Sequence, residues 1–255
     1  MSGSPAAAEA PRGAAWAGAA PQLGPREIHV WIVALDVLGA GWHGGPDPLS
    51  PAELDRAGRF RFALDRHAFV QRRTALREVL AAYLGVAPRD LVFDQNRFGK
   101  PSIRAPQTAA GLSFNASRSG SVAAIAVART GRIGIDIECL RPLPDATDIA
   151  SRCFAAGEVA ALQSLAPSDR VEGFFRAWTR KEALVKALGG GLSIPLDAFE
   201  VSVHPHDPPC ILRWAVRDES HAPWRLHRIE VSAGHVAALA ADFEASAVHG
   251  RRWPA

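Results

Sequence analysis

Apolar residues recur along this chain with two periods, and each period predicts one kind of element. In residues 65–85 they stand three and four positions apart, which predicts an amphipathic helix ended by Gly85. Residues 50–60 predict a shorter helix, with Ser50 as its N-cap and Pro51 in its first turn. Segments rich in β-branched or alternating apolar residues predict strands at residues 26–37, 90–95, 111–117, 121–128 and 132–138.

The second half of the chain repeats the pattern of the first. Residues 72–85 align without a gap with residues 176–189, which predicts a second helix ended by Gly189. Two further matches follow in the same order, residues 88–94 with 195–201 and residues 119–127 with 233–241. Three matches in one order predict a duplicated unit, and a binding cleft between two such copies is a common arrangement.

This repeat predicts an α+β fold, a pair of similar lobes at residues 26–140 and 141–245. Residues 1–25 are rich in alanine, glycine and proline, and we expect a disordered tail there and a shorter one at residues 246–255. Because the cleft would lie within one chain, we expect a monomer.

Composition then limits the classes of function. The chain has 255 residues, 48% of them hydrophobic, which is ample for a core. A formal net charge of +3 without an aromatic-interleaved basic run gives no support for nucleic-acid binding. No apolar run is long enough to span a bilayer, so we expect no membrane partner. Three cysteines without CxxC spacing favour a reducing, cytoplasmic location over a disulfide framework or a zinc site.

Acidic and basic side chains come together in two motifs. In "GIDIE" the strand period places Asp136 and Glu138 on one face, where paired carboxylates suit Mg²⁺, although a solvent-facing strand edge would look the same. Glu182 and Lys186 stand four apart on the second helix, the spacing of an ordinary surface ion pair. Lysine is rare here, however, since all but Lys100, Lys181 and Lys186 of the 29 basic residues are arginine.

Two further motifs could hold phosphate. "NRFGKPSI" places Lys100 in a Gly-Lys-Pro turn, and "FNASRSG" places Ser117, Arg118, Ser119 and Gly120 in a predicted loop rich in donors between two strands. An exposed lysine in a turn and a polar hairpin would account equally well for these two motifs taken alone.

In this order, "FGKP", "SFNASRSG", "IGIDIE", "FAAGE" and "FRAWTRKEALVKALGGGL" resemble the Sfp-type 4′-phosphopantetheinyl transferases, over residues 56–201. The resemblance implies a pseudo-twofold pair of α+β lobes in one chain. It also implies transfer of the phosphopantetheine arm of coenzyme A to a serine of an apo acyl or peptidyl carrier protein, with release of adenosine 3′,5′-bisphosphate. The metal of such an enzyme is Mg²⁺, with Mn²⁺ as an alternative.

The same resemblance assigns roles to individual residues. It implies Asp136, Glu138 and Glu182 as metal ligands and Asp136, Glu182 and Lys186 as catalytic residues, with Glu182 as the base and Lys186 stabilising the leaving oxygen. The residues that it matches to coenzyme A contacts are Arg56, Gln95, Asn96, Arg97, Phe98, Gly99, Lys100, Pro101, Asn115, Ala116, Ser117, Arg118 and Lys186. Arg73 and Arg77 are further candidates for the phosphate pocket.

One position departs from the family pattern. Arg118 stands where the family usually has histidine. Arginine can also bind phosphate, with a permanent charge and two parallel donors, so we expect binding to persist. Two alternatives stay open. One is a non-catalytic or weakly active homologue that binds coenzyme A. The other is a metal-dependent phosphohydrolase, which would release phosphate without a carrier.

Overall fold

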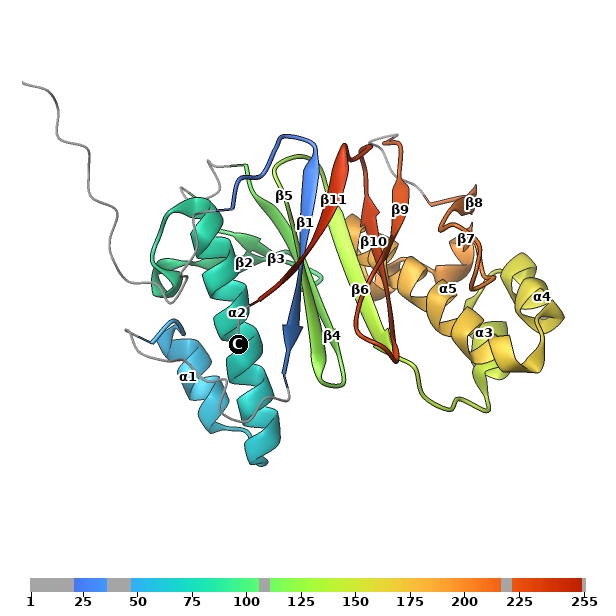
Figure 1. Cartoon of the computed structure of the whole chain (residues 1–255), viewed down its shortest axis with the longest axis horizontal. Helices are drawn as coiled ribbons and strands as arrows, with labels where there is room; N and C mark the ends of the chain where they lie inside the picture. The colour runs from blue at the N-terminus through green and yellow to red at the C-terminus, as the bar shows by residue number, and fades with distance from the viewer. Residues whose placement is uncertain (1–20, 36–46, 106–110, 217–221, 254–255) are drawn as a thin grey trace, which may run out of the picture.

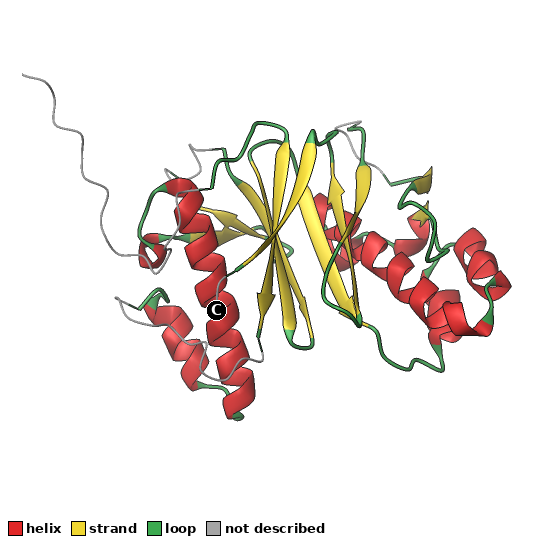
Figure 2. Ribbon diagram, in the orientation of Figure 1, coloured by secondary structure: helices red, strands yellow, loops and turns green. Residues whose placement is uncertain are grey.

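Two sheets face each other at the centre of the molecule, and a long helix covers the outer side of each (Figures 1 and 2). The structure is a computed structural model that describes residues 21–35, 47–105, 111–216 and 222–253. Apolar side chains fill three layers: between the first sheet and its helix, between the second sheet and its helix, and between the two sheets.

The first half of the chain supplies the elements β1 (Glu27–Ala34), α1 (Pro51–Gly58), α2 (Ala63–Leu84), β2 (Phe93–Gln95), β3 (Pro101–Ile103), β4 (Ser113–Ser119) and β5 (Val122–Ala128). The second half supplies β6 (Ile133–Cys139), α3 (Ala146–Cys153), α4 (Ala156–Ser164), α5 (Pro167–Leu188), β7 (Phe199–Val201), β8 (Ile211–Trp214), β9 (Arg225–Ile229), β10 (His235–Ala241) and β11 (Ala247–Arg252). Short 3₁₀ turns lie at Pro88–Asp90, Gly191–Ser193 and Leu196–Ala198.

The strand pairing shows the duplication directly. In the first sheet, β5 lies between β1 and β4 and is antiparallel to both. In the second sheet, β10 lies in the same way between β6 and β9. Each copy also has a two-stranded ribbon, β2 with β3 and β7 with β8. The predicted α+β fold of two similar units is therefore confirmed.

The two long helices are the best-matched parts of the repeat. Helices α2 and α5 both have 22 residues, and each is ended by a glycine in the left-handed region, Gly85 with φ 66° and Gly189 with φ 75°. Glycine adopts this conformation without the steric cost that a Cβ would impose. The helix periodicity predicted both of these C-terminal ends, while α5 begins at Pro167, nine residues before the predicted start.

Strand β6 belongs to the second copy of the repeat. It pairs with β10 and packs under α5, whereas the first sheet contains β11, β1, β5 and β4. The sequence placed the change of lobe at residue 140, after this strand. We call β1 to β5 with α1, α2 and β11 the first lobe, and β6 to β10 with α3, α4 and α5 the second lobe.

The predicted tail at 246–255 is wrong for residues 247–252, which form strand β11. This strand pairs in parallel with β1, so that Ala247 lies opposite Glu27. The tail predicted at residues 1–25 is wrong near its end, where Leu23 is 7% exposed and packs in the core of the first lobe. Residues 1–20 and 254–255, like the last two residues of the predicted strand 26–37, lie outside the described residues.

The loop predicted to hold phosphate is a strand in the structure. Residues 115–118 are part of strand β4, which continues to Ser119 before a tight turn at Gly120. Within the part of the chain that the structure describes, no helix is long and apolar enough to cross a membrane.

Candidate active site

A glycine in β6 allows helix α5 to lie directly on the second sheet. A Cβ at Gly134 would lie 2.1 Å from the carbonyl oxygen of Ala183 and 2.4 Å from the backbone nitrogen of Ala187, far inside van der Waals contact. The strand period then places Asp136 and Glu138 on the same face as Gly134. The helix residues Glu182 and Lys186 therefore come next to the acidic residues of the strand.

Lys186 joins the helix to both sheets. Its Nζ donates to Asp136 Oδ1 at 2.5 Å and to the hydroxyl of Ser117, on β4, at 2.9 Å. The Ser117 hydroxyl donates in turn to the same Asp136 oxygen at 2.8 Å, and Ser119 donates to Glu138 Oε2 at 2.7 Å. Predicted site residues from three elements thus meet in one hydrogen-bonded group.

The carboxylates of this group are partly stripped of water. Burial, and then the charges of Asp136 and Glu138, raise the pKa of Glu182, while Lys186 opposes this shift. Burial also raises the pKa of Asp136, again against the effect of Lys186. A carboxylate with a raised pKa accepts a proton more readily, which suits Glu182 to act as a base.

The residues present fit a hard divalent cation. Asp136 Oδ2 is buried without a hydrogen-bond partner, although its other oxygen has two. Leaving such an atom unpaired in the interior is costly. Asp136, Glu138 and Glu182 together offer oxygen ligands only, the chemistry that Mg²⁺ prefers.

The main cleft of about 670 Å³ opens beside this group. Glu182 and Lys186 line it together with apolar side chains, which include Trp178 of α5 and the fully exposed Leu192. Phe98, Gly99, Lys100 and Pro101 of the first lobe also line the cleft. Residues of both lobes line the cleft, so a ligand bound in it can contact both lobes.

The Gly-Lys-Pro turn is fixed to the end of helix α5. Lys100 Nζ donates to the carbonyls of Ala187 at 2.9 Å and Ile133 at 3.2 Å, and Asn96 Nδ2 donates to Gly189 O at 2.8 Å. Burial and the charge of Arg132 lower the pKa of Lys100 to about 8, with Asp242 opposing. The turn is therefore part of the cleft wall, and its lysine is a partly buried cation.

A second cavity of about 260 Å³ adjoins the first and is basic. Both cavities are lined by Pro101, Asn115 and Ala116. The cationic lining residues are Arg56, Arg72 and Arg73, and Ser117 and Gln95 also line the cavity. Such a group of cations suits the phosphates of an anionic ligand.

Arg72 is the most confined member of this basic group. Its Nε is buried without a hydrogen-bond partner. Burial, and then the charges of Arg118, Arg73 and Arg56, lower its pKa to about 10. Arg118 itself is exposed on β4. The sequence did not single out Arg72, although it stands next to Arg73 at the helix turn that faces Arg56.

Not every predicted contact residue is free to meet a ligand. Arg77 is 2% exposed, and its donors bond Glu53 and the carbonyls of Pro88 and Leu91. Arg73 also pairs with Glu53, although it lines the basic cavity. The Asn115 side chain accepts a hydrogen bond from the backbone nitrogen of Ile135, joining β4 to β6.

Arg97 stacks its guanidinium on the ring of Phe98, 4.6 Å from the ring centre. Neither of the two cavities described above includes Arg97 in its lining. Ser119, predicted with Ser117 and Arg118 as a phosphate donor, donates to Glu138 and holds it in place.

Lys181, which had no predicted role, points into the core of the second lobe. The residue is 0% exposed, and its Nζ lies 2.7 Å from Glu158 Oε2. The same Nζ donates to the carbonyls of Leu196 and Phe199, each at 2.7 Å. Lys181 therefore holds helix α4 and the start of β7 against α5.

Comparison with known proteins identifies the family of the chain. The family model described as "4′-phosphopantetheinyl transferase superfamily" matches residues 132–240. The model described as "4′-phosphopantetheinyl transferase, N-terminal" matches residues 40–130. The chain is 40% identical over 182 residues to 4′-phosphopantetheinyl transferase HetI of Nostoc sp., covering 71% of this chain and 76% of that protein. The chain belongs to the 4′-phosphopantetheinyl transferase family.

Other relatives are more distant but of the same kind. The chain is 30% identical over 193 residues to 4′-phosphopantetheinyl transferase Sfp of Bacillus subtilis, covering 76% of this chain and 82% of that protein. It is 38% identical over 120 residues to 4′-phosphopantetheinyl transferase AcpT of Escherichia coli O157:H7, covering 47% of this chain and 58% of that protein. The family predicted from the five motifs is confirmed, and the chain is a transferase of this class.

Proposed function

We propose that this chain transfers the 4′-phosphopantetheine arm of coenzyme A to a serine of an apo acyl or peptidyl carrier protein. The observation that carries the proposal is the contact of Lys186 with both Asp136 and Ser117, beside Glu182 and at the border of the basic cavity. The proposed base Glu182 and the cation Lys186 then lie together where the cleft meets the basic cavity.

The two cavities suit the two ends of coenzyme A. The basic cavity, with Arg56, Arg72 and Arg73, would take the phosphates of the nucleotide end. The larger cleft, with apolar residues such as Trp178 and Leu192, would take the pantetheine arm. The pyrophosphate between these ends would then lie at the shared border, near Ser117 and Lys186.

Glu182 and Lys186 would act on the reacting atoms themselves. Glu182 would accept the proton of the carrier serine while the serine oxygen bonds to the β-phosphorus. The bond from that phosphorus to the bridging oxygen breaks, and adenosine 3′,5′-bisphosphate leaves with both electrons. Lys186, fixed by Asp136, would stabilise the negative charge that develops on the leaving oxygen.

Asp136, Glu138 and Glu182 would hold Mg²⁺, with Mn²⁺ as an alternative, and this ion would neutralise charge on the pyrophosphate. Three further residues of the site position the groups that react. Ser117 and Ser119 orient the strand carboxylates, and Gly134 keeps α5 at the distance that this arrangement requires. We propose that the enzyme works as a cytoplasmic monomer without nucleic-acid or membrane partners.

The test is a mass measurement. The chain is mixed with coenzyme A, Mg²⁺ and a set of apo carrier proteins, and each carrier is weighed by mass spectrometry. We expect each accepted carrier to gain one phosphopantetheine, and to gain none when a chelator removes Mg²⁺. No gain on any carrier, with coenzyme A still bound, would favour the non-catalytic alternative that Arg118 raised. Release of phosphate without a carrier would favour a phosphohydrolase.

A further inference from the structure

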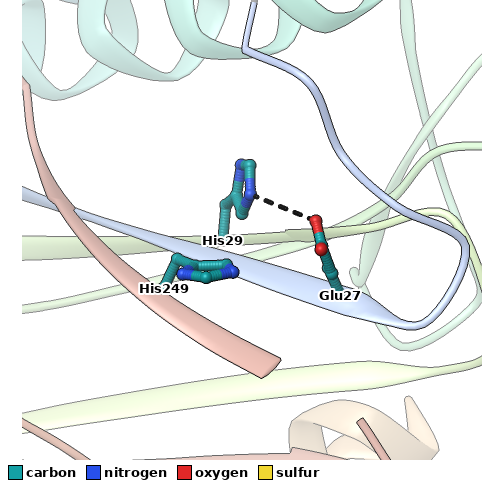
Figure 3. Close-up of side chains that lie close together, drawn as sticks. All are labelled: Glu27, His29 and His249. Atoms are coloured by element: carbon teal, nitrogen blue, oxygen red, sulfur yellow. Dashed lines mark ion pairs between the residues drawn. The ribbon is translucent and has the colours of Figure 1, made fainter. Parts of the chain in front are cut away.

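Three side chains that the proposed reaction does not use gather where β11 joins β1 (Figure 3). Glu27 and His29 are two residues apart on β1, and His249 is the residue directly opposite His29 on β11. One ligand atom from each lies within 4.8 Å of those of the other two, the one such group of three among the residues that the structure describes. The two imidazole rings are 5.5 Å apart, centre to centre.

The buried member of this group presents one ring nitrogen to the other two. His29 is 1% exposed, and its Nδ1 lies 2.6 Å from the hydroxyl of Tyr83. Its Nε2 lies 3.9 Å from Glu27 Oε2 and 3.5 Å from Arg251 Nη2. A guanidinium can only donate, so Nε2 accepts and Nδ1 carries the proton toward Tyr83.

This arrangement is the usual one for a histidine that binds a metal. Its second nitrogen donates to a neighbouring oxygen, which fixes the ring. The lone pair of Nε2 faces Arg251 Nη2 at 3.5 Å, so a metal ion would displace that guanidinium. With its proton on Nδ1 and none on Nε2, the imidazole is in its neutral form, the form that coordinates metal.

We propose that Glu27, His29 and His249 bind one divalent transition metal ion of the Zn²⁺ type. Two imidazoles and one carboxylate are a common ligand set for such ions, with a water in the remaining position. The proposed site is distinct from the carboxylates of β6 and α5, which offer oxygen alone and lie in the second lobe. Mg²⁺ has little affinity for imidazole, so the two sites select different ions.

Bound metal would clip β11 to β1. These strands form the one parallel pair in the described sheets, and β11 has no partner on its other side. A ligand that binds the folded state alone stabilises it by mass action. Arg251 works against the metal, because its charge lies close to His29 Nε2 while its guanidinium packs over the ring of Trp31 at 5.5 Å.

The test uses the full chain, stripped of metal with a chelator and returned to buffer with Mg²⁺ in large excess. Zn²⁺ is titrated by calorimetry, and thermal unfolding is followed with and without it. We expect one Zn²⁺ per chain and a higher unfolding midpoint. His249→Gln, which alters an exposed side chain, should weaken Zn²⁺ binding at least tenfold and remove the rise in midpoint.

A matched control is available at His206, which is also exposed and lies 5.5 Å from His204, ring centre to ring centre. His206→Gln should leave Zn²⁺ binding unchanged, and Arg251→Gln should strengthen it severalfold. The proposal fails if no Zn²⁺ binds, if His249→Gln binds as tightly as the unaltered chain, or if His206→Gln loses as much affinity as His249→Gln. None of these readouts needs coenzyme A or a carrier, so they stand apart from the transfer assay.

Discussion

Helix α2 lies on the first sheet and α5 on the second by the same plan, but the two contacts differ at one position. Facing α5, the second sheet has Gly134, and the helix backbone rests on the strand. In the first sheet a larger residue, His29, stands between β1 and α2, bonded to Tyr83 at 2.6 Å. The lesson is that a single missing side chain lets helix and strand residues form a joint site.

The two lobes nevertheless keep one device in common. Arg77 of α2 falls on Lys181 of α5 in the alignment of the helices, and each is a buried cation. Arg77 pairs with Glu53 near the start of α1, and Lys181 pairs with Glu158 near the start of α4. Both glutamates also bond backbone nitrogens at the starts of their helices. What the lobes share holds the fold together, and what they do not share is the proposed catalytic group.

The largest effect should come from the aligned pair of helix glutamates, Glu182 and Glu78. Glu182→Gln should lower transfer by about 10²–10⁴-fold, because the proposed base is lost. Glu78 bonds Trp253 instead, and burial raises its pKa, so Glu78→Gln should leave transfer unchanged. Steady-state rates with an apo carrier measure both. Equal losses in the two variants would contradict the assignment of catalysis to the second lobe.

The buried cations should come next in size. Lys181→Met leaves Glu158 buried without its cation, which should reduce the free energy of unfolding by about 3–5 kcal/mol. Arg77→Met should act similarly on the first lobe through Glu53. Denaturant unfolding with circular dichroism measures each.

The double variant Lys181→Met with Glu158→Gln should recover part of the loss, since no uncompensated charge remains. A loss no larger in Lys181→Met than in Arg66→Met, which alters an exposed cation of α2, would show that the ion pair has little weight.

A smaller effect is expected from closing the gap under α5. Gly134→Ala would force the helix away from β6 and should reduce transfer by about 10²-fold, since a displacement near 1 Å disrupts reacting geometry. Gly58→Ala is the control, because a Cβ there meets nothing within 4 Å. Coenzyme A binding and transfer are measured for both. Full activity in Gly134→Ala would show that the close contact is not required.

The smallest effect concerns the pH dependence of coenzyme A binding. The pKa of Lys100 is about 8 in the free chain, and a bound phosphate would raise it. Binding above pH 8 then takes up a proton, so the affinity should fall as pH rises, by up to about tenfold per pH unit. Calorimetry between pH 7 and about 9.5 follows this. Lys100→Met should bind more weakly and lose this part of the slope; an unchanged slope would rule out Lys100 as its source.

Local patterns were enough to predict much of the fold. Helix ends at Gly85 and Gly189 follow from backbone stereochemistry, and the cap at Ser50 from side-chain chemistry next to it in sequence. The face shared by Asp136 and Glu138 follows from the strand period. These features depend on near neighbours in the chain, which a single sequence displays.

The remainder depends on contacts between distant segments. Strand β11 has little strand pattern of its own and forms because β1 offers it an edge. Lys100 and Lys181 have the donors expected of ligand-binding residues, but both donate to carbonyl oxygens of the protein itself. The side chain of Asn115 accepts a hydrogen bond from the backbone nitrogen of Ile135. Which carbonyl a side chain meets is decided only when elements far apart in sequence have packed.

The pairing of β11 with β1 has a consequence for the order of folding during synthesis. The whole second lobe is made after β5 and before β11, so the first sheet keeps the open edge of β1 while its partner lobe is being completed. An open strand edge is a site for wrong pairing with other chains. The first lobe begins earlier but finishes later, and a ribosome-bound chain released before residue 247 would carry that edge exposed.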